Sequence, residues 1–73
     1  MTYEEAKNKA LKIDKTIDTA LEYKGAYVFF NSETAESKEN AEIVLLKTNG
    51  NRVTMSDYFI SSKDEDEPKK LQL

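Results

Sequence analysis

Apolar residues recur at steps of three and four through the first part of the chain, which predicts an amphipathic helix. The stripe consists of Tyr3, Ala6, Ala10, Ile13, Ile17 and Ala20. Thr2 followed by Glu5 is typical of a capping box, so we expect the helix to begin there. Residues 14–19 contain two threonines and two aspartates, which prefer caps and turns, and this favours a helix end near residues 14–15. The persistence of the stripe to Ala20 favours an alternative in which the helix continues to Tyr23.

Three later segments have the composition of β-strands. Residues 26–31 are rich in aromatic and β-branched side chains, and residues 43–48 and 51–55 flank the dipeptide Asn49-Gly50. This arrangement predicts a β-hairpin with a two-residue type I′ turn. We expect a short first strand at residues 21–23, followed by a turn in which Gly25 can adopt a positive φ.

The remaining segments are polar, apart from one short apolar cluster. Ser56-Asp57 can cap a short helix or turn that carries residues 58–60. Residues 33–40 are expected to form a surface loop, and residues 62–73 a disordered acidic tail. The prediction is therefore a single α+β domain over residues 1–61. Its N-terminal helix would pack on one face of an antiparallel sheet of roughly three or four strands.

The expected hairpin register separates the side chains into two faces. A two-residue loop pairs Leu46 with Val53, and the faces alternate along each strand. The face predicted to lie under the helix carries Val44, Leu46, Val53 and Met55. The opposite face carries Ile43, Leu45, Lys47, Arg52 and Thr54.

Both faces of the expected sheet carry large apolar residues, and one helix can cover only one of them. Uncovered apolar surface of this kind usually marks an interface. Because tyrosine is enriched at interfaces, we expect the uncovered face to be the one bearing Tyr27 and Phe29 rather than the one bearing Val28 and Phe30. The predicted partner-binding residues are Tyr27, Phe29, Ile43, Leu45 and Arg52. Three uses of this face stay open: cover by residues 58–60, a homodimer interface, or a site for a dedicated partner.

The composition excludes several classes of function. The 73 residues contain no cysteine and no histidine, so no disulfide or thiolate metal site is expected and no imidazole can serve as a base. Two glycines cannot form a phosphate-binding loop. We therefore expect no enzymatic activity, no cofactor and no metal. The acidic run at residues 64–67 lacks the spacing of a calcium-binding loop.

The charge pattern also limits the partners and the location. A formal net charge of −3 argues against binding to nucleic acid or to an anionic membrane. Mimicry of nucleic-acid phosphates would require the scattered carboxylates to gather on one side; these are Glu33, Glu36, Glu39, Glu42 and those of the tail. No apolar run approaches the roughly 18 residues of a membrane span. The acidic N-terminus is unlike a signal peptide, which predicts a cytoplasmic protein.

Three segments together resemble a group of small proteins from phages and prophages of Gram-positive bacteria. The segments are residues 22–30 (EYKGAYVFF), residues 43–50 (IVLLKTNG) and residues 55–58 (MSDY). The resemblance covers about residues 1–61 and concerns strands, turns and caps. A weaker resemblance links the "VFF-NS" strand and the hairpin to small toxin-immunity proteins. The phage resemblance carries no function of its own. We expect a non-enzymatic phage or mobile-element accessory protein in a bacterial host that acts by protein–protein contact, in its most specific form by obstructing a host defence protein; the alternatives are a virion assembly component and an immunity protein.

Overall fold

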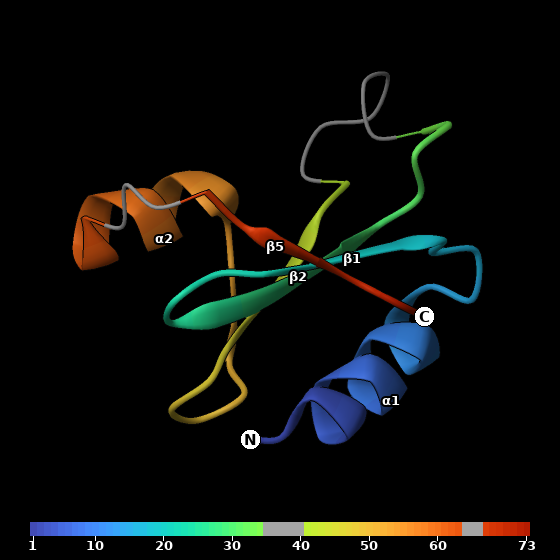
Figure 1. Cartoon of the computed structure of the whole chain (residues 1–73), viewed down its shortest axis with the longest axis horizontal. Coiled ribbons are helices and arrows are strands. Elements are labelled where there is room, and N and C mark those ends of the chain that lie inside the picture. Colours follow the sequence, from blue (N-terminus) through green and yellow to red (C-terminus); the bar gives the residue numbers. More distant parts are fainter. Residues whose placement is uncertain (35–40, 64–66) are drawn as a thin grey trace.

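The computed structural model describes residues 1–34, 41–63 and 67–73. Within these residues the chain forms two helices and one five-stranded antiparallel sheet. Helix α1 (Tyr3–Ile13) packs on one face of the sheet and helix α2 (Met55–Ser62) on the other (Figure 1). The predicted α+β class with an N-terminal helix is confirmed, but the sheet has five strands rather than three or four.

Helix α1 has the boundaries that the sequence predicted. The Thr2 hydroxyl accepts a hydrogen bond from the Glu5 N–H, and the Glu5 carboxylate accepts one from the Thr2 N–H, which completes the capping box. The helix ends at Ile13 because Asp14 is extended and its carboxylate accepts hydrogen bonds from the N–H and the hydroxyl of Thr16. The chain then enters strand β1 (Thr19–Glu22), so the alternative of a helix continuing to Tyr23 is wrong.

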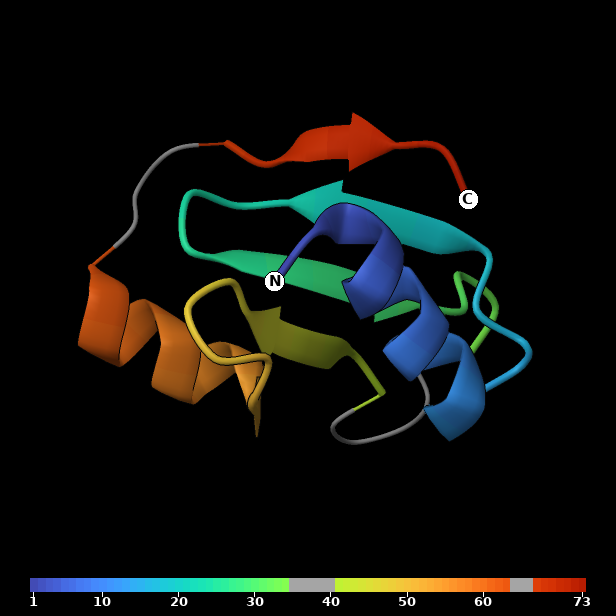
Figure 2. The same ribbon diagram turned by 90° about the horizontal axis from the view of Figure 1, so that it is seen from below.

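The sheet has the strand order β4-β3-β2-β1-β5. The other strands are β2 (Ala26–Phe30), β3 (Ile43–Leu46), β4 (Arg52–Val53) and β5 (Lys69–Leu71). Figure 2 shows β5 beside β1 at one edge of the sheet. Strands β1 and β2 form a hairpin in which the Tyr23 N–H donates to the Ala26 carbonyl, 2.8 Å away.

Strand β5 corrects the prediction of a disordered tail. Lys69–Leu71 pair with β1, and the Leu71 side chain packs against the core beneath α1. The Tyr3 hydroxyl also donates a hydrogen bond to the Gln72 carbonyl, 2.8 Å away. These contacts are made with α1 and β1, which are distant from the tail in sequence. They could therefore not be inferred from the polar composition of the tail itself. Residues 64–66 of the acidic run, and residues 35–40 of the predicted loop, lie outside the described residues.

The β3–β4 hairpin differs from the predicted register by two residues. Val44 pairs with Val53, and residues 47–50 form the loop between Leu46 and Asn51. A type I′ turn needs a positive φ at both central residues, but among the described residues of this loop only Gly50 has one, at 72°. Since the shift is two residues, the strand residues that were predicted to share a face still share one, whichever helix covers it.

The sheet separates two apolar clusters. The cluster under α1 consists of Ala6, Ala10, Ile17, Ala20, Tyr27, Phe29, Ile43 and Leu45. The cluster on the α2 side consists of Ala26, Val28, Val44 and Tyr58. The face predicted to lie under the N-terminal helix, with Val44 and Leu46, therefore lies on the opposite side.

Candidate binding groove

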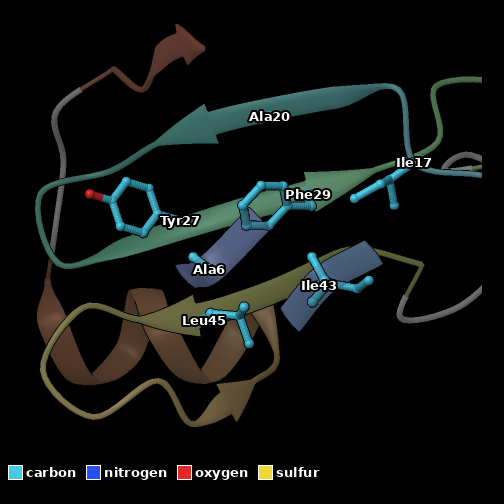
Figure 3. Close-up of a cluster of buried hydrophobic side chains, with 8 residues drawn as sticks. Ala6, Ile17, Ala20, Tyr27, Phe29, Ile43 and Leu45 are labelled. Carbon is cyan, nitrogen blue, oxygen red and sulfur yellow. The ribbon is translucent and has the colours of Figure 1, made fainter. Parts of the chain in front are cut away.

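Four of the five predicted partner-binding residues are buried under α1 (Figure 3). Phe29 and Leu45 have no exposed surface, and Tyr27 is only 8% exposed. Ala6 and Ala10 on α1 are also fully buried, and these small residues leave room for the aromatic rings beneath the helix. The prediction chose the wrong face, and neither a partner nor a second copy of the chain can reach these four side chains in the folded protein.

The aromatic side chains on this face are held by the start of α1. The Tyr3 ring stacks on the Phe29 ring at a centroid distance of 6.0 Å, and it lies 5.5 Å from the Tyr27 ring. Burial raises the pKa of the Tyr3 hydroxyl above its ordinary value. At the other end of the Tyr27 ring, the Lys47 ammonium lies 4.9 Å from the centroid and forms a 2.8 Å ion pair with Glu22. Tyr3, Tyr27 and Phe29 thus belong to the core, and the Lys47–Glu22 ion pair lies at its polar edge.

The opposite face of the sheet is covered only in part. Tyr58 of α2 is 1% exposed and covers the centre, over Ala26, Val28 and Val44. Around this centre lies a ring of partly buried apolar side chains: Leu21, Tyr23, Phe30, Leu46, Val53 and Met55. Cover by residues 58–60 is one of the three uses that the sequence leaves open for the face that α1 does not cover. The structure shows this cover, but it is incomplete.

A groove of about 490 Å³ lies where β4 meets the first turn of α2. Its lining consists of Glu42, Arg52, Val53, Thr54, Met55, Ser56 and Asp57. We call it the β4–α2 groove. Thr54 shapes it by ending β4 and capping α2, since its hydroxyl accepts a hydrogen bond from the Asp57 N–H at 3.0 Å. Arg52, the fifth predicted binding residue, is exposed here.

The charged groups of the β4–α2 groove have no partner within the described part of the chain. Glu42, Arg52 and Asp57 form no ion pair there, and their side chains make no hydrogen bond. The groove also contains apolar surface from Val53 and Met55, which are partly buried. A groove that combines a few polar groups with apolar walls is the usual form of a binding site.

Two apolar side chains of α2 extend this surface. Ile60 is 74% exposed, and Phe59 is 39% exposed and packs edge-on against Tyr23 and Tyr58. Ile60 follows Ser56 by one helical turn and therefore lies on the same side of α2 as this lining residue. Sequence could have found this feature, because consecutive residues of a helix point in different directions. Tyr58, Phe59 and Ile60 therefore cannot all be buried on one face.

A second hollow, of about 410 Å³, lies on the α1 side of β4. Its lining includes Ile13 and Thr16 from the end of α1, together with Ile43 and Arg52. Arg52 thus borders both hollows, and Ile13, which is 44% exposed, is the counterpart of Ile60 on the other side of the sheet.

Comparisons of the chain with protein-family models, with curated proteins and with solved structures found no match. Neither helix in the described part of the chain has the length and hydrophobicity that crossing a membrane requires. Those same residues contain no group of three or more acidic side chains close enough together to hold a metal ion.

Proposed function

We propose that this chain is a protein-binding module without catalytic activity, and that it engages its partner through the β4–α2 groove and the adjoining Phe59 and Ile60. The observation that carries the proposal is the position of Ile60, which is 74% exposed and lies one helical turn after Ser56, a residue that lines the groove. The charged residues of this groove are unpaired within the described chain. Burying a branched apolar side chain of this size stabilises a complex by about 1.5–3 kcal/mol.

The two carboxylates in the described part of the chain whose pKa is clearly shifted are poorly suited to acid–base chemistry. The pKa of Asp18 is lowered, first by the hydrogen bond from the Ser32 N–H and then by those from the Thr19 and Ser32 hydroxyls. The pKa of Glu5 is lowered by the N–H and hydroxyl of Thr2 in the capping box. A general base works best with a pKa near the operating pH, and both groups are displaced away from neutrality.

The resemblance to small phage proteins supports a protein of the bacterial host as the partner. In this form of the proposal, binding obstructs the host protein, and a defence protein is the target that such an element has most reason to block. The groove residues, rather than Tyr27 and Phe29, are the ones that would make the contact.

The proposal is tested by capture of partners from a lysate of a Gram-positive bacterium with three immobilised proteins. These are the wild-type chain, Ile60→Glu, and the matched control Ile13→Glu, which places the same charge on the α1 side. We expect proteins that the wild type and the control retain but that Ile60→Glu loses. Recovery of the same proteins with all three would contradict the proposed surface.

A further inference from the structure

The two edges of the sheet differ in how open they are to another strand. Strand β5 follows Pro68 and begins with Lys69 and Lys70, and prolines and lysines at an edge discourage the addition of a further strand. Strand β4 at the other edge has neither proline nor lysine; it is two residues long, carries the exposed Arg52, and borders the β4–α2 groove. An edge of this kind can accept an extended peptide as an additional strand.

Within residues 1–34, 41–63 and 67–73, the hydrogen-bond pattern leaves one residue of β4 with backbone groups that do not bond to β3. The Leu46 N–H donates to the Asn51 carbonyl at 3.0 Å, and Leu45 then pairs with Arg52 in the register. Pairs in an antiparallel ladder alternate between hydrogen-bonded and non-hydrogen-bonded, so Leu45 and Arg52 form a non-hydrogen-bonded pair. The N–H and the C=O of Arg52 therefore point away from β3, toward the open edge.

The groove beside this edge suits a long basic side chain. Val53 and Met55 offer apolar walls, and Glu42 and Asp57 contribute two carboxylates that are unpaired within the described chain. Lysine and arginine bury an aliphatic stem against apolar surface and keep their charged end beside polar groups. Arg52 also borders the groove, but strand alternation directs its side chain toward the α1 face with Leu45, where it borders the second hollow as well.

We propose that the partner adds a strand to β4, pairing with the Arg52 backbone, and inserts a lysine or arginine side chain into the β4–α2 groove between Glu42 and Asp57. This inference rests on the proposed function and specifies the partner segment: an extended stretch with a basic residue on the side that faces α2. Backbone pairing supplies affinity, and the groove selects the side chain.

The test is an NMR titration of the isotope-labelled full chain with a defined probe. The probe is the peptide Thr-Val-Lys-Val-Thr, capped at both ends; a second peptide carries glutamate in place of lysine, and a third has N-methylated backbone amides. We expect the lysine peptide to bind weakly, because a short flexible ligand loses conformational freedom on binding, and to shift the amide signals of β4 and of the first turn of α2. Hydrogen exchange at the Arg52 amide should become slower.

Two variants distinguish the effect of the groove carboxylates on peptide affinity from the effect of the net negative charge of the chain. The double variant Glu42→Gln with Asp57→Asn should weaken binding of the lysine peptide about four- to twenty-five-fold, because each exposed ion pair contributes about two- to fivefold. The control Glu4→Gln removes a carboxylate from the first turn of α1 and should leave the affinity unchanged. The amide spectrum of each variant reports whether it is folded.

Several outcomes would overturn the inference. These are equal binding of the glutamate peptide, equal binding of the N-methylated peptide, shifts confined to β5, or no shifts at all. The capture experiment does not use the peptide, so an Ile60-dependent partner recovered there would preserve the proposed function even if the strand inference failed.

Discussion

Tyr58 is the side chain that attaches α2 to the sheet. It is 1% exposed, and its ring covers Ala26, Val28 and Val44. Its hydroxyl accepts a hydrogen bond from the Gly25 N–H at 3.0 Å, in the turn between β1 and β2. A Cβ at position 25 would lie 3.4 Å from this hydroxyl, which is close to ordinary van der Waals contact, and Gly25 does not have the positive φ that the sequence suggested.

Substitution of Tyr58 should separate these two contributions. Tyr58→Phe keeps the ring but leaves the Gly25 N–H without its acceptor, and we expect the free energy of unfolding to fall by about 1 kcal/mol. Tyr58→Ala also removes the buried ring and should cost about 3–5 kcal/mol. Urea denaturation measures both values. The neighbouring substitution Phe59→Leu, on a half-exposed ring, should change stability much less, and equal effects at positions 58 and 59 would contradict this account.

Asp18 links the start of β1 to the end of β2 and makes stability depend on pH. Its carboxylate accepts hydrogen bonds from the Ser32 N–H at 3.0 Å, from the Ser32 hydroxyl at 2.8 Å and from the Thr19 hydroxyl at 2.8 Å. These bonds favour the charged form, so the pKa of Asp18 is lower in the folded chain than its ordinary value. The resulting stability is present above the ordinary pKa and is lost as pH falls through the folded pKa.

We therefore expect Asp18→Asn to lower the Tm at pH 7. The difference from the wild type should become smaller below about pH 4, where the wild-type carboxylate gains a proton. Thermal unfolding followed by circular dichroism at both pH values measures this change. Glu33→Gln removes a carboxylate that makes no side-chain contact in the described chain and should retain the wild-type pH dependence. A constant difference between Asp18→Asn and wild type at all pH values would argue against the mechanism.

Among the elements, α1 and β2 show how far sequence could predict the fold. The capping box and the polar residues after Ile13 act locally, so both ends of α1 were predictable. Strand β2 was also predictable from its composition, but its two faces are almost equally apolar. The face that lies under α1 is decided by how the α1 alanines pack against the rings of Tyr27 and Phe29. This contact is long-range, and the pattern of apolar residues along β2 does not reveal it.

The edge elements were less predictable, and the candidate site lies at one of them. Asn49-Gly50 indicated the hairpin correctly, but the Lys47 N–H donates to the Gly25 carbonyl, which keeps Lys47 beside β2 and lengthens the loop. The register differs from the predicted one by two residues, and β4 has only two residues. Of the candidate site, sequence reasoning identified Arg52 alone. The groove also depends on where α2 begins, at Met55, rather than at the turn expected near Ser56-Asp57.

At the scale of the whole molecule, the two edges of the sheet have different roles. Strand β5 belongs to the fold, because Leu71 packs under α1 and the Gln72 carbonyl accepts a hydrogen bond from Tyr3. It also occupies the outer edge of β1, whose backbone groups would otherwise be unpaired. Strand β4 stays open beside the groove. The C-terminal segment thus restricts strand addition to the edge at which we propose that the partner binds.

Removal of β5 should therefore affect stability and association together. A chain that ends at Glu67 loses the β1–β5 hydrogen bonds and the packing of Leu71, and we expect its free energy of unfolding to fall by about 1–3 kcal/mol. The exposed edge of β1 should then pair with other copies, so sedimentation velocity should show dimers whose fraction rises with concentration. Leu71→Ala in the full chain keeps the backbone pairing and should lower stability without causing association. A truncated chain with the same sedimentation behaviour as the full chain would mean that β5 does not protect this edge, and the proposed division of roles between the two edges would then lose its basis.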